Sequence, residues 1–357
     1  MSLRVGIAGC GAVHGTHAAA LARIPDATLS GFFDILPSRS QASGEKFGAP
    51  AFESFEELLA ASDAISVCTP SGLHAEVGVA AAMAGKHLLV EKPIDVTLDA
   101  ARALVAACRG SGTKLGVISQ HRFARDILRA KDAIEDGLLG PMLEGDAYIK
   151  WYRTQAYYDS GDWRGTKKLD GGGCLINQGI HYIDMIQWLM GGVKSVLAQV
   201  RTAAHNIEVE DVAAALVEYR SGAIGVIQGS TSFFPGLAER LEVHGKKGTL
   251  VIEGDRAKVW EIDDCDEEDG SLYGRGVQMQ PTPNVHLSAI VIEEEIMDPA
   301  ERWIEQHRLQ IEDFVRACLD DREPFITGEM ALEPLKTILA IYESARRGGE
   351  KVEVCSL

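Results

Sequence analysis

The chain has 357 residues, 46% of them hydrophobic, with a mean hydropathy of −0.01; it is too long for one ordinary core and is expected to form two globular domains. Its formal net charge of −17 argues against a nucleic-acid partner, because a phosphate backbone would repel it. No apolar run is long enough to span a bilayer, so no membrane association is expected. The seven cysteines form no C-x-x-C pair, which indicates a cytoplasmic protein with reduced thiols and no metal site.

The first predicted strand, residues 3–8, leads through a glycine-containing turn into a predicted helix that begins near residue 16. A G-x-G turn between a strand and a helix is the context of a dinucleotide-binding fingerprint. Gly9 permits the tight turn, and Gly11 lets a pyrophosphate approach the helix N-terminus. The motif is weak alone, since His14 stands where a third glycine is expected. The turn residues expected beside the cofactor are Gly9, Gly11, Ala12, Val13 and His14.

The second predicted strand, residues 27–33, ends in an acidic residue, Asp34. Its position relative to Gly11 is near the spacing of the acid that hydrogen-bonds the adenosine ribose of a dinucleotide. A carboxylate there would repel a 2′-phosphate, so Asp34 favours NAD over NADP. Arg39, which lies close by, could soften that preference.

Strands and helices then alternate as far as residue 119, a pattern that implies parallel strands joined by crossover helices. We therefore predict that residues 1–122 form an NAD(P)-binding α/β Rossmann domain with a doubly wound parallel sheet. Ligands of such sheets lie beyond the carboxyl ends of the strands. The further cofactor candidates at strand ends are Thr69, Pro70, His74, Glu91, Lys92 and Gln120.

From residue 123 to 357 the rhythm changes to long extended stretches, with helices returning near 305–320 and 329–346. The segments RSGA and GKKGT are typical of hairpin turns. These features predict an α+β domain with a large open, mostly antiparallel sheet. The acidic run at 263–270 is expected to be a solvated loop.

One helix is predicted to run from the triple glycine at 171–173 to about Met190. Its polar residues Asn177, His181 and Asp184 share a stripe with Trp188, beside a stripe of isoleucines. This pattern indicates a helix with one face in the core and another lining a cavity. The glycines before it indicate close packing.

Together these segments resemble the glucose-fructose oxidoreductase, inositol dehydrogenase and rhizopine-catabolism (Gfo/Idh/MocA) family over nearly the whole chain. Each motif is weak alone, but the set is specific. The motifs are the G-x-G turn, Thr69-Pro70 with His74, Gly85-Lys86-His87, Glu91-Lys92-Pro93, Trp163-Arg164-Gly165, Gly171 to Gly173 with Asn177 and His181, and the tail from Ile341 to Ala345. The resemblance implies NAD(P)-linked oxidation or reduction of a sugar or cyclitol carbon, with the second domain, residues 123–357, used for substrate binding and oligomerisation. It also implies that Lys92 is the catalytic lysine and that His181 matches the family's helix histidine.

This chain departs from the family pattern at Asn177, where members acting on inositol carry an aspartate four residues before the histidine. With an asparagine at this position, the chain resembles the branch of the family that oxidises nucleotide-linked amino sugars. An amide cannot take up a proton, so a relay from His181 through this position is in doubt, and inositol becomes a less favoured substrate.

For the chemistry we expect His181 to act as general base on the substrate hydroxyl and Lys92 to stabilise the developing alkoxide. The two roles could be exchanged, because burial can lower the pKa of a lysine enough for it to act as a base. Asp184 could orient the imidazole or face elsewhere. The expected substrate contacts are Lys92, Arg122, Tyr152, Trp163, Arg164, Asn177 and His181.

The sequence thus predicts an NAD-dependent dehydrogenase or reductase of a sugar, a sugar derivative or a cyclitol. Two alternatives stay open at this point. One is a glycosidase that retains NAD and oxidises C3 transiently before elimination, and the other is a non-catalytic NAD-binding regulator. An open sheet face must be covered, so a homodimer or homotetramer is expected.

Overall fold

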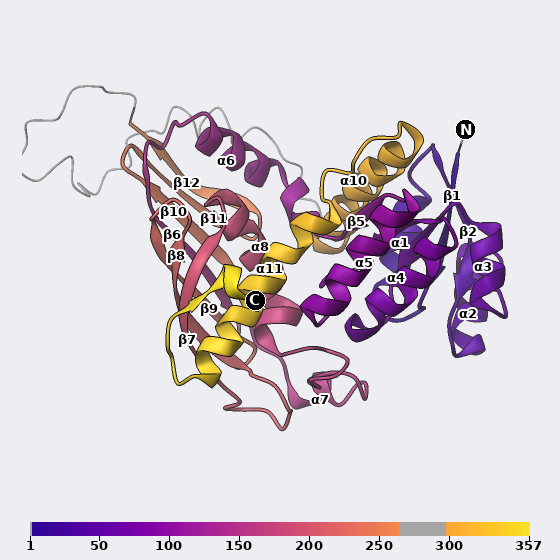
Figure 1. Cartoon of the computed structure of the whole chain (residues 1–357), viewed down its shortest axis with the longest axis horizontal. Coiled ribbons are helices and arrows are strands. Elements are labelled where there is room, and N and C mark those ends of the chain that lie inside the picture. Colours follow the sequence, from indigo (N-terminus) through magenta and orange to yellow (C-terminus); the bar gives the residue numbers. More distant parts are fainter. Residues whose placement is uncertain (1, 264–297) are drawn as a thin grey trace, which may run out of the picture.

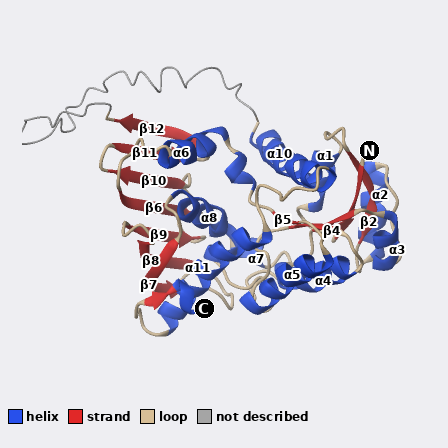
Figure 2. Cartoon of the chain, turned by 45° about the horizontal axis from the view of Figure 1, so that its top comes forward, coloured by secondary structure: helices blue, strands red, loops and turns tan. Residues whose placement is uncertain are grey.

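The computed structural model describes residues 2–263 and 298–357, which form two sheets side by side with helices between and around them (Figures 1 and 2). The first sheet is five-stranded, in the order β2-β1-β3-β4-β5, and every neighbouring pair is parallel. Its strands are β1 Leu3–Ala8, β2 Ala27–Phe33, β3 Ala64–Val67, β4 His87–Val90 and β5 Leu115–Val117. The predicted Rossmann domain is confirmed.

Helices cover both faces of this sheet because its strands are apolar on both sides: β3 is buried throughout, and β1 and β4 almost throughout. The covering helices are α1 His14–Leu21, α2 Pro37–Phe47, α3 Phe55–Ala61, α4 His74–Met83 and α5 Leu98–Ser111. Local chemistry sets the ends of α5. Thr97 accepts a hydrogen bond from the Ala100 N–H at its start, and Gly112 takes the left-handed conformation after its last turn.

Helix α10, Pro299–Leu319, belongs to the core of the first domain although it lies far along the chain. Its apolar residues Ile311, Phe314 and Val315 pack in one cluster with Val5 and Ile7 of β1. The predicted division at 122/123 does not account for this helix. Its apolar stripe predicted a helix correctly, but a stripe does not indicate which of two cores it will cover.

The second sheet has eight strands in the order β12-β11-β10-β6-β9-β8-β7-β13. All its pairs are antiparallel except β6 with β9, so the predicted mostly antiparallel sheet is confirmed. Both predicted hairpin turns join neighbouring strands, at β8–β9 and β10–β11. The strands are β6 Met142–Lys150, β7 Val193–Arg201, β8 Val212–Tyr219, β9 Ile224–Ser230, β10 Arg240–Gly245, β11 Gly248–Glu253, β12 Arg256–Ile262 and β13 Val352–Glu353.

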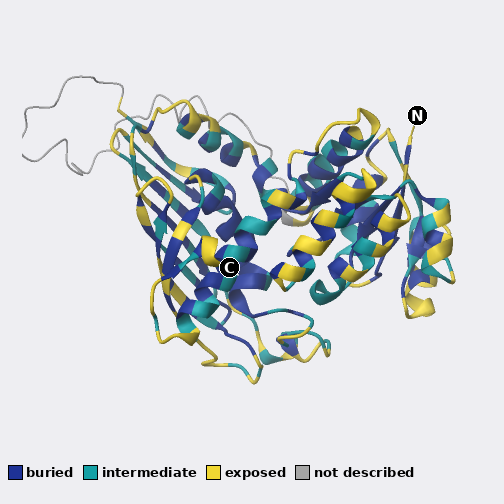
Figure 3. Cartoon of the chain, in the orientation of Figure 1, coloured by how far each residue is buried: buried dark blue, intermediate teal, exposed yellow. Residues whose placement is uncertain are grey.

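Three helices lie on one face of this sheet: α6 Arg125–Glu135, α8 Ile180–Leu189 and α11 Gly328–Arg346 (Figure 2). They separate it from the first domain, and a short helix, α7 Gln155–Tyr158, lies in a long connection after β6. Burial is deepest between the sheet and α8 (Figure 3). Leu197, Leu216 and Ile224, on β7, β8 and β9, remain exposed.

The predicted continuous helix from the triple glycine to Met190 is two segments, a π-helical turn at Cys174–Gly179 followed by α8. The buried Glu210 carboxylate accepts hydrogen bonds from the N–H groups of Gly173 and Leu175 and from the Tyr342 hydroxyl. A side chain at Gly172 or Gly173 would overlap Tyr342 or the Glu210 backbone. The close packing predicted for the glycines is therefore confirmed. The π-helical turn directly follows these glycines.

Across residues 2–263 and 298–357, no helix combines the length and the apolar character needed to cross a membrane. The acidic run predicted to be a loop lies outside the described residues from position 264 onward.

Candidate active site

The structure brings Lys92 and His181 together, although they lie far apart in the sequence. Lys92 follows the carboxyl end of β4, and His181 lies in the first turn of α8. Both line one small pocket together with Ser119, which follows β5. The site therefore lies at the junction of the two domains, at the strand edge where ligands of such sheets bind.

Lys92 is held by a backbone group of the second domain. Its Nζ donates a hydrogen bond to the Asn177 carbonyl oxygen at 2.7 Å. Burial lowers the pKa of Lys92; the carboxylates of Glu91 and Asp170 oppose that change and Arg164 adds to it. The ammonium is thus positioned to donate a hydrogen bond to a substrate oxygen in this pocket.

His181 is buried, and it makes no hydrogen bond to any residue that the structure describes. Burial lowers its pKa well below the usual value, and the neighbouring Lys92, His121 and His307 lower it further. The imidazole is therefore neutral at neutral pH and offers a lone pair. A neutral imidazole beside a cationic lysine is suited to accept a hydroxyl proton.

Asp184 does not orient His181. It pairs with Arg122, whose Nε and Nη2 donate to the two carboxylate oxygens at 2.7 and 2.5 Å, and it accepts a further hydrogen bond from Ser119. The Arg122 guanidinium also stacks on Trp188, 4.7 Å from the ring centroid. Arg122 is only 2% exposed, so the structure argues against it as a substrate contact. Its ion pair instead ties the end of β5 to α8.

Asn177 contributes through its backbone as well as its side chain. The side-chain amide donates to the buried carboxylate of Asp170, which also accepts from the Gly165 N–H at 2.8 Å. Burial raises the pKa of Asp170. Sequence reasoning missed this residue, although it directly precedes the glycine triplet. Asp170 places a carboxyl group near Lys92 even though position 177 has none.

The predicted cofactor turn has the geometry that a dinucleotide requires. Gly9 has a φ of +93°, and a Cβ there would lie 2.7 Å from the Cys68 backbone, whereas the space beside Gly11 is open. The Thr69 hydroxyl and both amide atoms of Gln120 are buried without a hydrogen-bond partner in the described chain. Unpaired buried polar atoms are costly, so a polar ligand is expected to satisfy them. The residues present therefore fit NAD.

Asp34 lies beside this turn at the end of β2. Its carboxylate oxygens accept hydrogen bonds from the N–H groups of Cys10 and Leu36 at 2.7 and 2.8 Å. Each oxygen keeps a further lone pair for a ribose hydroxyl. Ala12 and Val13 lie just before the N-terminus of α1, where free N–H groups and the helix dipole favour a phosphate.

The His14 ring lies against the cofactor turn and is held there by two hydrogen bonds. Its Nδ1 lies 2.5 Å from the Gly11 carbonyl oxygen and its Nε2 lies 2.9 Å from the Ser43 hydroxyl. The ring packs edge-on against Phe32 and Phe47. The side chain fastens the turn to α2, and only the backbone of His14 is left to meet a phosphate.

His74 is likewise structural. Its Nδ1 lies 2.7 Å from the Pro93 carbonyl oxygen and its Nε2 lies 2.9 Å from that of Thr69. It is 1% exposed, so the predicted cofactor contact is not supported. The ring joins the loop after β3 to the loop after β4. Pro70, between these loops, stays a prediction.

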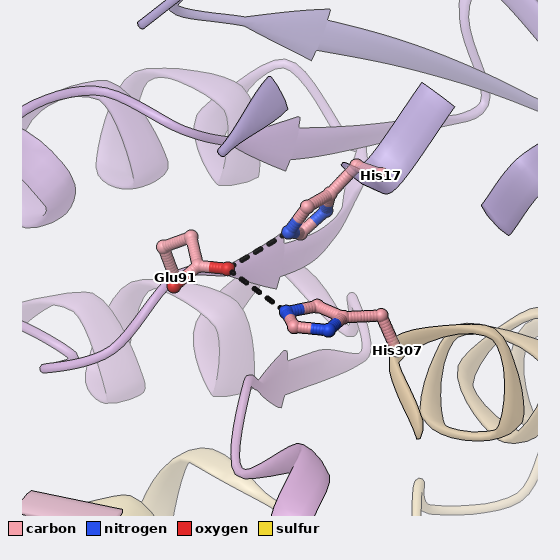
Figure 4. Close-up of side chains that lie close together, drawn as sticks. All are labelled: His17, Glu91 and His307. Carbon is pink, nitrogen blue, oxygen red and sulfur yellow. Dashed lines mark hydrogen bonds and ion pairs between the residues drawn. The ribbon is translucent and has the colours of Figure 1, made fainter. Parts of the chain in front are cut away.

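Glu91 lies between two histidines (Figure 4). Its Oε1 lies 2.8 Å from Nε2 of His17 on α1 and 3.9 Å from Nε2 of His307 on α10, and all three residues are buried. Burial opposes both charges. The His17 hydrogen bond nevertheless lowers the pKa of Glu91 to about 2, and the Cys68 sulfur and the Glu91 carboxylate raise that of His17 to about 10.

The predicted contact of Glu91 with the cofactor is therefore not supported. Because His17 and Glu91 meet in a direct hydrogen bond, we interpret the cluster in Figure 4 as an ion pair that fixes the backbone just before Lys92. The sequence alone could not predict that these three residues meet, because they belong to elements far apart along the chain.

Two arginines and several aromatic residues form a separate group in the second domain. Arg164 stacks on Trp163 and Tyr157, with its guanidinium carbon 4.4 Å from each ring centroid, and it donates to the Tyr157 hydroxyl. Arg153 also stacks on Tyr157, with its guanidinium carbon 5.3 Å from the ring centroid. Within the described chain neither arginine forms an ion pair with a carboxylate. Tyr152, also predicted to contact substrate, is partly exposed.

A Rossmann domain with a dinucleotide turn, joined to an open-sheet domain that supplies a buried histidine, defines a nicotinamide-dependent oxidoreductase. Two family models match this chain. The NAD-binding Rossmann-fold model of the GFO/IDH/MocA oxidoreductases covers residues 3–119, and the C-terminal-domain model of the same family covers residues 127–251. The chain belongs to this family, as its motifs predicted.

The WlbA dehydrogenase from Bordetella pertussis, solved with NADH and UDP-GlcNAcA, is 31% identical to this chain, with a TM-score of 0.84 over 99% of each chain. The WlbA dehydrogenase from Chromobacterium violaceum, also solved with NADH and UDP-GlcNAcA, is 28% identical, with a TM-score of 0.83 over 99% of this chain and 96% of that chain. A myo-inositol 2-dehydrogenase from Thermotoga maritima is 28% identical, over 76% of this chain and 81% of that protein.

Proposed function

We propose that this protein oxidises a secondary hydroxyl group of a nucleotide-linked sugar acid, with NAD as hydride acceptor. The observation that carries the proposal is the pairing of Lys92 with a neutral, buried His181 in one pocket at the domain junction. The likeness to WlbA over the full chain supports the substrate class, since that protein was solved with UDP-GlcNAcA.

The chain's own residues divide the reaction between them. His181 takes the hydroxyl proton on its lone pair, while the Lys92 ammonium donates a hydrogen bond to the same oxygen as negative charge develops there. Bound NAD supplies the acceptor for the hydride from the carbinol carbon. The turn at Gly9 and Gly11, with Thr69, Gln120 and Asp34, would hold it.

The acidic part of the substrate is assigned to the arginine pair around Tyr157. Arg153 and Arg164 are stacked on aromatic rings, and among the described residues neither forms an ion pair with a carboxylate, although the chain has a net charge of −17. Stacking leaves the N–H edges of a guanidinium free to bind a carboxylate or a phosphate.

A substrate panel tests the proposal. The chain would be mixed with NAD and, separately, UDP-GlcNAcA, UDP-GlcNAc or myo-inositol, and the absorbance of NADH followed. We expect the acidic nucleotide sugar to be oxidised with the highest kcat/KM. The substitution Arg153→Gln should raise its KM roughly tenfold, as for one lost charge-assisted hydrogen bond, with a smaller effect on UDP-GlcNAc. Arg201→Gln, at an exposed position on β7, is the control.

The same assay separates the alternatives. Free NADH that accumulates in step with the ketone product supports the dehydrogenase, whereas a glycosidase would return the hydride and accumulate none. Neither alternative is favoured, since the relatives named above are dehydrogenases. No reduction of NAD by any sugar of the panel would contradict the proposal.

We further propose a cytoplasmic location, because the six cysteines in the described residues are all free and four of them are buried. A homo-oligomer is proposed from the exposed leucines and isoleucine on the open face of the second sheet. Neither nucleic acid nor a membrane is proposed as a partner, given the strongly acidic composition.

A further inference from the structure

A second histidine lies against His181. His121 lies in the 3-10 turn Gln120–Phe123 that follows β5, and its ring centroid is 4.8 Å from that of His181. It is partly exposed, whereas His181 is buried, so the ring in contact with His181 also reaches solvent.

His121 is paired with an acid from the other domain. Its Nδ1 lies 2.6 Å from Oδ2 of Asp255, and the same oxygen accepts a hydrogen bond from the Gln306 amide at 2.9 Å. A carboxylate can only accept, so it fixes the proton of neutral His121 on Nδ1. The lone pair on Nε2 then has no hydrogen-bond partner among the described residues.

Asp255 occupies an unusual place for a hairpin residue. It lies in the turn between β11 and β12 with a φ of +67°, a conformation that aspartate tolerates better than most residues. Turn aspartates commonly meet water, but this one is 9% exposed. Although burial opposes its charge, His121 and Gln306 lower its pKa. The turn therefore places an ionised carboxylate at the junction of the domains.

We propose that His121 and Asp255 form a positioning pair that carries the substrate proton away from His181. The inference rests on the proposed oxidation. In each turnover the hydroxyl proton passes to His181, then to Nε2 of His121, and from there to solvent, while the hydride passes to NAD. Asp255 stabilises His121 in its transiently charged form. The products are the ketone, NADH and one proton, so atoms and charge balance.

The pair explains how a buried base is reset. Among the described residues His181 has no hydrogen-bond partner through which to lose a proton, and its lowered pKa makes the charged form costly. The Asp255 carboxylate, in direct contact with the neighbouring His121 ring, offers that charge a counterion. The arrangement of acid, imidazole and reacting group follows the logic of hydrolase triads.

The substitution His121→Asn tests the pair. An asparagine amide can keep a hydrogen bond to Asp255 from the Nδ1 position, but it has no counterpart of Nε2. With UDP-GlcNAcA and NAD we expect kcat to fall at least tenfold, with NADH affinity unchanged, and added imidazole to restore much of the rate. His244→Asn is the matched control, since His244 lies on β10, where its ring contacts Thr249 and Glu242.

A second variant, Asp255→Asn, covers the case in which the first fails to fold, and its kcat should also fall. Turnover within twofold of wild type in either variant would overturn the inference. A loss in His121→Asn that imidazole does not restore would also overturn it and indicate a structural role. If the wild-type chain oxidises no sugar of the panel, the proposed function fails and this inference with it. Normal wild-type turnover with unaffected variants removes this inference alone.

Discussion

At the scale of single residues, burial decides which proton carriers are charged. Lys92 and His181 lie in one pocket, and burial lowers the pKa of both. For His181 the result is a neutral base, whereas the carboxylates of Glu91 and Asp170 help Lys92 to retain its proton. The two groups thus have different protonation states at neutral pH, as proton transfer to one and charge stabilisation by the other require.

A pH profile of kcat/KM for oxidation checks this assignment. Activity needs neutral His181, so kcat/KM should fall at low pH only as that imidazole becomes protonated. Because its pKa is lowered, this fall should lie below pH 6.5, the usual pKa of histidine. It also needs charged Lys92, so the loss at high pH should begin below the usual 10.5. An acidic limb at or above pH 6.5 that persists in His121→Asn would contradict the lowered pKa of His181.

Some of the single-residue predictions agree with the geometry of the structure, and others do not. Lys92 and His181, which the structure brings together in one pocket, could be proposed because each lies within a motif that resembles the family's. His74 and Arg122 were predicted to contact ligands because each follows a predicted strand. The sequence alone does not show whether a polar residue there contacts a ligand or a distant residue of the same chain. The partners of Arg122 and Glu91 lie 62 and 74 residues away in sequence, and such pairings follow only from the fold.

At the scale of elements, β4 is connected to both α1 and α10 through the cluster in Figure 4. His17 and Glu91 form a buried ion pair, and removal of one partner leaves an uncompensated charge. The strand end that presents Lys92 therefore depends on two helices from opposite ends of the chain. The sequence predicted all three elements but could not predict their connection.

We expect Glu91→Gln to lower the free energy of unfolding by about 3 kcal/mol and to reduce turnover as well. The folded pKa of Glu91 is about 2, below its usual 4.5, so the pair's contribution is lost as the pH falls from 4.5 through 2. That of His17 is about 10, above 6.5, so the contribution is also lost as the pH rises from 6.5 through 10. The difference from wild type should be greatest between pH 4.5 and 6.5.

Urea denaturation across this pH range measures the effect. The matched control is Glu329→Gln, which removes the exposed ion pair with Arg109 and should change stability little. Equal stabilities of the two variants at pH 5.5 would show that the Glu91 pair contributes no more than a surface contact.

At the scale of the whole molecule, the site is built from both domains, and one face of the large sheet is left open. The helices between the sheets bury the other face (Figures 2 and 3). Leu216 and Ile224 are 60% and 61% exposed on adjacent strands, which is unusual for a sheet that stays in water. The composition and strand pattern predicted such a sheet, but not which side chains it would expose.

We expect a second copy of the chain to cover this face. The double substitution Leu216→Glu with Ile224→Glu should convert a dimer or tetramer into smaller species, because paired carboxylates would repel across a symmetric contact. Light scattering coupled to size exclusion measures the mass. Met83→Glu, at an exposed position on α4, is the control. A wild-type chain that elutes as a monomer would contradict the expectation.

The central claim is that Lys92 acts on the reacting oxygen and does not merely end a strand, and Lys92→Met tests it most directly. We predict that kcat with UDP-GlcNAcA falls by about a thousandfold while NADH binding, measured by fluorescence titration, stays close to wild type. Lys86→Met is the matched control, since Lys86 also donates to a backbone carbonyl, that of Ser62 at 2.9 Å, at the opposite end of β4. Turnover of Lys92→Met within twofold of wild type would contradict the account.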